Sequence, residues 1–371
     1  MIIFIDLFTI ALTFMKKSTD KSAAGVKEIA RLAKVSIATV DRVIHNREGV
    51  SEKTKNKIQG IIQKLNYQPN VLARRLALAS RGTIRLAVLL PNISSETEFW
   101  QAPLDGVNQA ESEIKQYGIE IERYFFDQND EVSFDKQVKK IIRLKPDGIL
   151  FTPTFPEESI RLTEDCKKSG IPYVMINSDI PGYDSLCYIG AEIFHSGYLA
   201  AQLVNYCIKK DEQVLVVKIA REIDNNYAIL RKEDGFRAYF QDNHLQNKIL
   251  TLDSKQTDYA AVSRKLDQLM KKQKNIGAIF VTNSRVSIVA KYLDKAGLND
   301  VVLLGYDFTK DNVDYLKAGS IDFLICEKPQ EQGYRGVMTL FQHLVYSNII
   351  EKNYLMPIDI ITKENYQFYR N

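Results

Sequence analysis

Hydrophobic positions follow two different spacings along the chain, and the change between them divides it into parts. From about residue 25 to 65, apolar residues recur every three or four positions. This spacing predicts three short amphipathic helices, over 26–33, 37–44 and about 51–65. From about residue 83, short apolar runs bounded by turn residues alternate with stretches of helical spacing. That alternation predicts βαβ units with parallel sheets, and two sets of five or six strands predict two doubly wound α/β lobes.

The three predicted helices have the arrangement of a helix-turn-helix unit. Lys34, Val35 and Ser36 interrupt the first helix, and Ser36 is a good N-cap for the second. Two short helices joined by a tight turn and backed by a third place the second helix in the major groove of DNA. From periodicity alone, a three-helix bundle with a solvated basic face remains the alternative.

The outward positions of the second helix suit contacts with DNA. Arg42 could donate two hydrogen bonds to guanine, whereas Ile37 and Ala38 could contact thymine methyl groups. Ser36, Thr39 and the helix N-terminus suit phosphates. The second helix therefore carries both base-reading and phosphate-binding candidates.

The charge distribution separates the same region from the rest of the chain. Of 371 residues with a net charge of +4, residues 16–85 contain 16 Lys and Arg against 5 Asp and Glu. Residues 86–371 contain 34 Lys and Arg against 40 Asp and Glu. A basic head on an acidic body favours a polyanion-binding module joined to another domain, with a basic linker or tail as the alternative.

A dense motif covers this basic region. It reads Val26-Lys-Glu-Ile-Ala-x-x-Ala-x-Val-Ser-x-x-Thr-Val-x-Arg-Val-Ile44, followed by Val50-Ser51 and Leu65-Asn-Tyr-x-Pro-Asn70. The motif resembles the lactose-repressor (LacI/GalR) family of transcription regulators over about sixty residues. The resemblance implies that Ile37, Ala38 and Arg42 read bases. Asp41 stands where the family commonly has Ser, which leaves the operator sequence open.

The residues after the third helix form only a marginal helix by themselves. Pro69 ends the third helix and Asn70 can cap a new one, but residues 70–79 have no large apolar face. The resemblance implies a hinge helix that folds when two copies pair in the minor groove. Leu76 is then the wedge that unstacks a base step, and Ala73 packs nearby; ordinary packing is the alternative for Leu76.

Over the body the resemblance is weaker and implies a periplasmic sugar-binding-protein fold. Ligands of doubly wound sheets bind beyond the carboxyl ends of strands, so the cleft between the two lobes is the expected pocket. The effector-binding residues that the resemblance implies are Asn177, Ser178, Asn283, Asp307 and Glu327, and Phe99 and Trp100 could stack on a ring. Arg231, or Lys232 beside it, suits a carboxylate or phosphate. The family often has Asp at position 177, Gln at position 327 and Arg at position 230, where this chain has Leu.

Motifs for catalysis and metal binding do not occur in the sequence. Gly-rich phosphate loops, G-x-S-x-G and H-E-x-x-H are absent, and the four Cys and four His are scattered. We therefore expect no enzyme, no catalytic residue, no cofactor and no metal. The prediction is a cytoplasmic, homodimeric DNA-binding regulator, a repressor controlled by a small metabolite. The expected metabolite is a sugar or sugar derivative, with a nucleoside, a polyol or another metabolite as the alternative. A solute-binding protein of transport or chemosensing, and a ligand-responsive enzyme on the same lobes, remain alternatives.

The first fifteen residues are apolar apart from Asp6 and two Thr. They are fewer than the ~20 residues that span a bilayer, and they lack the positive start and cleavage site of a signal peptide. We expect residues 1–24 to be a leader or disordered extension, with Met15 as an alternative start and no membrane association; a packed helix or a membrane anchor are the alternatives. The predicted domains that follow are 25–69 for DNA binding, 70–82 for the hinge and linker, and 83–371 for effector binding and dimerisation.

Overall fold

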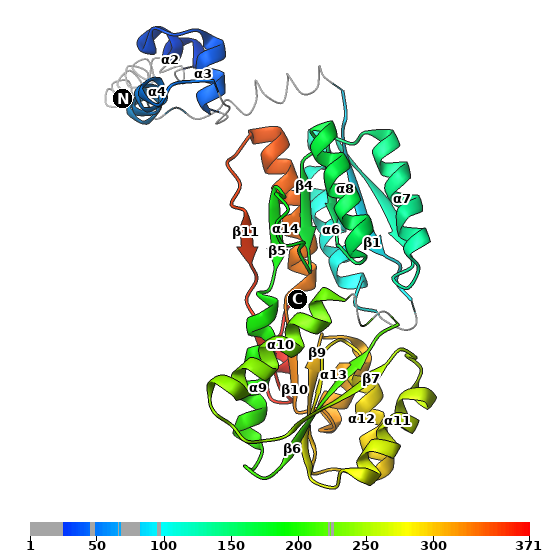
Figure 1. Ribbon diagram of the computed structural model, residues 1–371. Coiled ribbons are helices and arrows are strands. Elements are labelled where there is room, and N and C mark those ends of the chain that lie inside the picture. The colour runs from blue at the N-terminus through cyan, green and yellow to red at the C-terminus, as the bar shows by residue number, and fades with distance from the viewer. Residues whose placement is uncertain are drawn as a thin grey trace, which may run out of the picture. The chain divides into compact units, whose positions relative to one another are not determined.

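The computed structural model describes residues 25–44, 49–65, 67, 82–94, 98–221, 223 and 226–371. Contacts divide the chain into two units, with a boundary between Arg81 and Gly82. The first contains a helical headpiece and the second an α/β body, and each is described separately (Figure 1). The predicted leader 1–24 lies outside the described residues, as does the predicted hinge apart from Gly82.

The headpiece contains the three predicted helices, α2 (Val26–Ala33), α3 (Ile37–Ile44) and α4 (Glu52–Lys64). Their apolar faces meet in one small core, whose buried members are Ile29, Ala30, Ala33, Val40, Val43 and Ile58. Lys34, at φ 56°, ends α2, and the Nζ of Lys57 donates to the carbonyl of Ala33, at 2.8 Å. Ser51 caps α4 by accepting the backbone N–H of Thr54 at 3.4 Å. The helical periodicity therefore predicted this unit correctly.

The body consists of two lobes, each with a six-stranded sheet. In the first lobe all the strands are parallel, in the order β11-β5-β4-β3-β1-β2. Their bounds are β1 (Ile84–Pro91), β2 (Ile119–Phe126), β3 (Gly148–Phe151), β4 (Tyr173–Ile176), β5 (Cys187–Gly190) and β11 (Asn353–Leu355). Helices α7 (Glu131–Leu144) and α8 (Pro156–Ser169) pack together, and α6 (Gln101–Ile114) packs against α14 (Pro329–Phe341).

The second lobe repeats this plan with the order β12-β10-β9-β8-β6-β7. Its strands are β6 (Gln213–Ile219), β7 (Ile249–Ser254), β8 (Ile276–Val281), β9 (Val302–Tyr306), β10 (Phe323–Cys326) and β12 (Asp359–Ile361), of which only β12 is antiparallel to its neighbour. Its helices are α9 (Ile193–Cys207), α10 (Tyr227–Asp242), α11 (Tyr259–Lys272), α12 (Val286–Ala296) and α13 (Lys310–Ala318). Because strands such as β6 and β8 are buried along almost their whole length, they appear as continuous apolar runs in the sequence.

The chain passes between the lobes at three crossovers. The first joins β5 to α9, the second joins β10 to α14, and the third joins β11 to β12. The two lobes of the predicted doubly wound fold are therefore confirmed. Strands β11 and β12 were not predicted, since each is three residues long and has no helix between it and the other.

Candidate DNA-binding face and effector cavity

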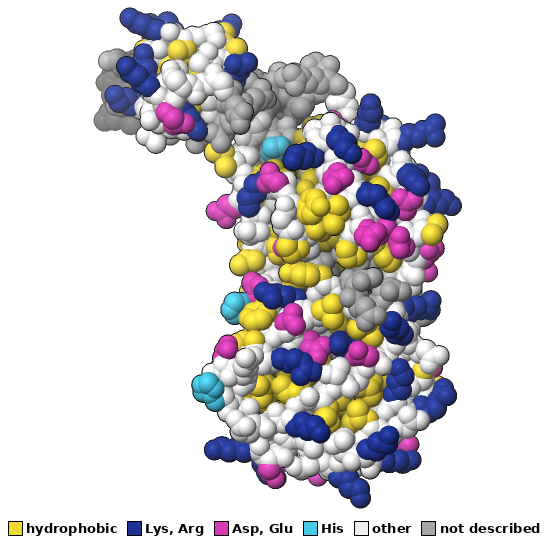
Figure 2. All heavy atoms as spheres, in the orientation of Figure 1, with side chains coloured by type: hydrophobic (Ala, Val, Ile, Leu, Met, Phe, Trp, Pro, Cys, Tyr) yellow, Lys and Arg dark blue, Asp and Glu magenta, His cyan; other side chains and the backbone are white. Residues whose placement is uncertain are grey.

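Helix α3 presents one buried and one exposed face. Val40 and Val43 are buried in the headpiece core, whereas Ile37, at 50% exposure, Ala38 and Arg42 lie on the surface. This is the separation that a recognition helix needs, because base edges are read by side chains that the helix does not use for its own packing. Figure 2 shows Lys and Arg side chains at several places on the visible headpiece surface.

The start of α3 is fixed by a local hydrogen-bond pair. Ser36 Oγ accepts the backbone N–H of Thr39 at 3.0 Å and lies 2.8 Å from Thr39 Oγ1. Both hydroxyls are thus at the helix N-terminus, where backbone N–H groups favour anions. The structure brings Ser36, Ile37, Ala38, Thr39 and Arg42 to one end and face of α3, whereas Ala73 and Leu76 lie outside the described residues.

A cavity of about 690 Å³ lies between the two lobes of the body. Its walls come from the segments that follow β1, β2, β3 and β4 in one lobe and β6, β8, β9 and β10 in the other. Ligands of doubly wound sheets bind at such carboxyl ends. The predicted effector residues that line it are Phe99, Trp100, Asn177, Ser178, Asn283, Asp307 and Glu327.

The first lobe contributes an aromatic wall. The rings of Phe99 and Trp100 meet edge to face, with centroids 4.8 Å apart. Trp100 is buried, and its Nε1 donates to the Oε1 of Gln128 at 3.1 Å. This hydrogen bond fixes the orientation of the indole against the cavity.

Asn177 and Ser178 follow β4 in a turn that is held from behind. Asn177 has a φ of 69°, a left-handed conformation that Asn adopts more readily than most residues. Its backbone N–H donates to the Oε1 of Gln332 at 2.8 Å, while Ser178 Oγ donates to the carbonyl of Pro153 at 3.3 Å. The turn thus reaches the cavity in a defined conformation.

The second lobe contributes a buried charged group. Glu327 accepts a hydrogen bond from Ser196 Oγ at 2.7 Å and lies 3.5 Å from the Nζ of Lys232. The same Nζ lies 3.5 Å from the centroid of the Tyr306 ring. All four side chains are buried, so the positive charge is balanced inside the wall by a carboxylate and by the ring face.

Asp307 follows β9 beside this group and has a φ of 74°. Burial raises its pKa to about 7; Lys232 opposes this rise and the carboxylate of Glu327 adds to it. The side-chain amide of Asn312 donates to the carbonyls of Tyr306 and Asp307, at 2.9 and 3.0 Å. A carboxyl group that changes charge near neutral pH therefore faces the cavity from a fixed turn.

Asn283 also lines the cavity, but its side-chain amide is hydrogen-bonded to the backbone. Its Nδ2 donates to the carbonyl of Ile219 at 2.7 Å, and its Oδ1 accepts the backbone N–H of Arg285 at 3.2 Å. A ligand would therefore compete for the remaining hydrogen-bonding capacity of this amide.

The structure corrects the expectation for Arg231, which does not line the cavity. Its guanidinium lies over the Phe194 ring, 4.4 Å from the centroid, while Lys232 lines the cavity in its place. The reason is helical periodicity, because Phe236 packs in the core and the residue four positions earlier, Lys232, shares its face of α10. Counting back from Phe236 in steps of one turn would have selected Lys232 from the sequence.

Two further residues, one from each lobe, line the cavity. Asp179 follows Ser178 in the first lobe, and Tyr227 begins α10 in the second. Burial raises the pKa of Asp179, and burial together with Asp179 raises the pKa of Tyr227. Asp179 was only a weak candidate from the sequence and Tyr227 was not among the predicted ligands, since the sequence alone does not show that these two segments meet.

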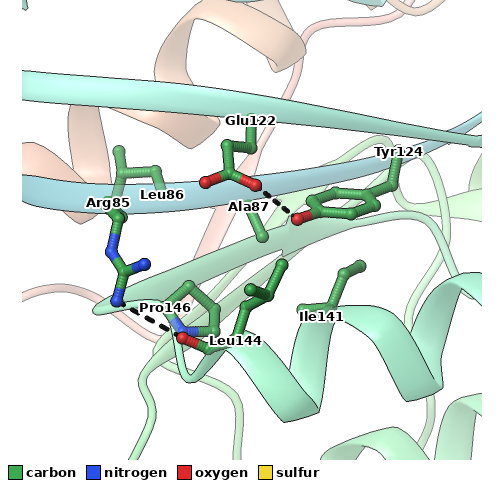
Figure 3. A pocket seen from close by; sticks show the side chains of 8 residues that line it. All are labelled: Arg85, Leu86, Ala87, Glu122, Tyr124, Ile141, Leu144 and Pro146. Atoms are coloured by element: carbon green, nitrogen blue, oxygen red, sulfur yellow. Dashed lines mark hydrogen bonds between the residues drawn. The ribbon is translucent and has the colours of Figure 1, made fainter.

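A second hollow, of about 10 Å³, lies beside β1 and β2 and admits no more than a water molecule (Figure 3). Arg85 closes one side by donating to the carbonyl of Leu144 at 3.4 Å, and Tyr124 donates to Glu122 at 2.5 Å.

Within the part of the chain that the structure describes, no cluster of His, Cys, Asp and Glu has the arrangement of a metal site. None of the described helices combines the length and apolarity needed to cross a bilayer.

Two family models match the chain. The periplasmic binding protein domain matches residues 86–347, and the lacI family of bacterial regulatory proteins matches residues 25–70. The HTH-type transcriptional regulator RegA of Clostridium acetobutylicum is 32% identical over 194 residues, which is 51% of this chain and 53% of RegA. The match thus spans about half the length of that relative.

Solved structures match the body more completely. A Bacteroides fragilis protein described as a LacI transcriptional regulator is 30% identical, with a TM-score of 0.72, and the match covers 78% of this chain and 100% of that one. A solute-binding protein from Burkholderia graminis, in complex with D-arabinose, shares the fold at 18% identity, with a TM-score of 0.69 and 78% and 99% coverage. The chain belongs to the lacI family of bacterial regulatory proteins, and its body is a periplasmic binding protein domain.

Proposed function

We propose that the protein is a transcriptional repressor whose affinity for its operator is controlled by a sugar or sugar derivative bound between the lobes. The observation that carries this proposal is the presence, in one chain, of a helix-turn-helix headpiece and a body with a 690 Å³ cavity. A solute-binding protein would use the body without a headpiece. The proposal includes a cytoplasmic location and no catalytic activity.

The chemistry of the cavity supports a neutral, hydroxyl-rich effector. Trp100 offers an aromatic surface to the apolar face of a sugar ring, and Asn177 and Asp307 offer polar groups for hydroxyls. The charges of Lys232 and Glu327 already balance each other at 3.5 Å. An ionic effector would have to displace this pairing, which a neutral effector leaves in place.

On the DNA side, we propose that Arg42 reads a base and that Ser36 and Thr39 contact phosphate. Ile37 and Ala38 would contact thymine methyl groups, and Ala73 and Leu76 keep their proposed roles in the minor groove. One headpiece reads only a half-site, so we propose that a homodimer binds a two-fold symmetric operator.

The proposed mechanism links the two sites through the lobes. An effector that closes the cavity changes the spacing of the two hinge segments in a dimer, and hence the stability of the DNA-bound state. Coupling of this kind is commonly about 1–3 kcal/mol, or roughly a five- to 150-fold change in operator affinity. Whether the effector releases or strengthens DNA binding depends on which lobe spacing the hinges need.

The first test is selection of binding sites from random duplexes, followed by titration of the selected duplex. Arg42→Ala should lose about 1–3 kcal/mol of specific affinity and relax preference at one base pair. Lys53→Ala, an exposed change on α4, is the control and should weaken all duplexes equally. If the protein prefers no duplex over random competitor, the proposed function fails.

The second test uses the single tryptophan of the sequence as a reporter. Because Trp100 lines the cavity, its fluorescence should change when the protein is titrated with a monosaccharide or polyol that binds there. A panel of aldoses, polyols, uronic acids and nucleosides identifies the class. Sugar binding without any selective DNA binding would instead favour a solute-binding protein.

A further inference from the structure

The last six residues of the described chain, Tyr366–Asn371, contact two functional parts of the body at once. Tyr366–Phe368 form one short 3-10 turn, η3, and the chain continues as extended backbone at Tyr369. Figure 1 marks the C end of the chain between the lobes, where α14 begins. This segment therefore lies at the second crossover, which joins β10 to α14.

Tyr369 is the centre of these contacts. Its ring packs against Phe308, with centroids 4.8 Å apart and the planes at 44°. The Nζ of Lys328 also lies 4.4 Å from the centroid of the same ring. One aromatic side chain thus joins the turn after β9 to the crossover after β10.

Both partners of Tyr369 are direct neighbours of residues that line the cavity. Phe308 follows Asp307, and Lys328 follows Glu327. Lys328 has a φ of 55°, so the crossover itself contains a residue in the left-handed conformation. A contact that restrains Phe308 and Lys328 therefore restrains the backbone that orients Asp307 and Glu327.

The crossover is held at further points by the same region. Lys328 Nζ donates to the carbonyl of Arg370 and lies 3.0 Å from a carboxylate oxygen of Asp359 in β12. The backbone N–H of Gln330, in the first turn of α14, donates to the Oδ1 of Asn371 at 3.1 Å. That N–H has no partner within its own helix, so Asn371 satisfies it from outside.

Gln332 extends this connection to the first lobe. Its Nε2 donates to the carbonyl of Glu327 at 2.7 Å, and its Oε1 accepts the backbone N–H of Asn177 at 2.8 Å. The turn at Asn177, the crossover at Glu327 and the turn at Asp307 are thus linked by a continuous series of contacts. The backbone N–H of Asp307 donates to the carbonyl of Ile325 in β10 at 3.0 Å, and segment Tyr366–Asn371 adds a side-chain link between the last two.

We propose that Tyr366–Asn371 is a strap that couples the effector-site turn at Asp307 to the second crossover, with Tyr369 as its positioning residue. The strap restrains the hinge about which the lobes move, so it sets how effector contacts with Asp307 reach the lobe spacing. This inference rests on the proposed role of the cavity as the effector site, but the physical link between the two segments does not.

Hydrogen–deuterium exchange of the full-length protein without added sugar tests the link. Tyr369→Leu keeps a partly buried apolar side chain but removes the ring contacts to Phe308 and Lys328. We expect exchange about tenfold faster in both 306–310 and 326–332, with β6 unchanged. Phe368→Leu, whose side chain is 71% exposed in the same segment, is the matched control and should change neither.

Three results would overturn the proposal. Faster exchange in only one of the two segments would show that Tyr369 does not couple them. Equally faster hydrogen exchange in β6 would show a general loss of lobe stability. An equal effect of Phe368→Leu on exchange would show that the ring contacts of Tyr369 are not what restrains the two segments. If Tyr369→Leu does not fold, Asn371→Ala should loosen 326–332 through loss of the Gln330 hydrogen bond, and unchanged exchange there would also overturn the strap.

The proposed function and the strap can fail separately. If the protein selects no duplex and no sugar alters Trp100 fluorescence, the regulatory role fails, whereas coupled exchange in Tyr369→Leu would still establish the strap. If the protein binds operator and sugar but the two segments exchange independently, the strap fails alone.

Discussion

Asp307→Asn gives a direct test of the electrostatics of the cavity. Asn is close in shape to Asp and tolerates the left-handed φ of 74° at this position, so the turn should persist. The change removes the one carboxyl group of the turn whose pKa burial raises from 3.8 to about 7. Any effect on the pH dependence of stability therefore reports the ionisation of this group.

The sign and size of the effect follow from linkage. A carboxyl group whose pKa is higher in the folded protein makes the folded state bind a proton more tightly than the unfolded chain does. Its contribution is most favourable below pH 4 and is lost as pH rises to about 7. A shift of about three units at 1.36 kcal/mol each gives an upper value of roughly 4 kcal/mol, and partial solvent access of the half-buried turn reduces it to about 2–3 kcal/mol.

The assay is urea denaturation followed by circular dichroism at half-unit steps from pH 4.5 to 8. Relative to the parent, Asp307→Asn should gain about 2–3 kcal/mol between the two ends of this range. Asp300→Asn, an exposed change in the loop before β9, is the control and should run parallel to the parent. If the curve for Asp307→Asn is also parallel to that of the parent, the carboxyl group is not shifted, and its assigned environment is wrong.

Three other changes test separate parts of the structure. Gly197→Ala should destabilise the body by about 2–3 kcal/mol and weaken sugar binding, since its Cβ would lie 1.9 Å from the carbonyl oxygen of Lys232. Gly60→Ala, which has open space around it, is the control and should have neither effect. Thermal melts and sugar titrations followed by Trp100 fluorescence compare the two variants. Glu233→Gln should lower the free energy of unfolding at pH 7, measured by urea denaturation, by about 2–3 kcal/mol. It should also make the free energy of unfolding depend less on pH in acid. Burial alone would raise the pKa of Glu233, but hydrogen bonds from Lys218 and Arg237 lower it, so its contribution is present above pH 4.5 and lost in acid. Gln128→Ala should shift Trp100 emission and weaken sugar binding by about 1 kcal/mol, because the indole loses its 3.1 Å hydrogen bond; an unchanged spectrum would remove this role.

Sequence patterns predicted the headpiece well because its information is local. Each of α2, α3 and α4 follows from apolar spacing within one helix, and the caps at Ser36 and Ser51 act within four residues. Most strands of the two lobes were also predictable, since buried parallel strands are continuous apolar runs, whereas the short strands β11 and β12 were not. These features need no knowledge of which segments meet in space.

The cavity was predictable only in part, because its geometry depends on long-range contacts. Residues such as Asn177 and Asp307 directly follow strands, so their place at the carboxyl edge follows from the fold class. The choice of Lys232 over Arg231 was within reach of the sequence, because Lys232 lies one helical turn before the core residue Phe236 on α10. The electrostatic effect of Asp179 on Tyr227 required the relation between the lobes, which no local pattern encodes.

Backbone conformation connects the effector cavity with the crossover. Asn177, Asp307 and Lys328 all have positive φ, at 69°, 74° and 55°, and each lies directly after a strand or next to a residue that does. Such conformations cost a non-glycine residue roughly 1–2 kcal/mol, less for Asn and Asp, and persist where neighbouring contacts impose them. The contacts at these residues are those of Gln332 with the backbone N–H of Asn177, of Asn312 with the carbonyl of Asp307, and of Arg370 and Asp359 with the Nζ of Lys328. Because these contacts come from residues outside each turn, a movement of one contacting residue changes the backbone conformation of a residue that lines the cavity or adjoins it. Lobe movement and effector contact are therefore expected to be linked through these three positions rather than through the rigid sheets.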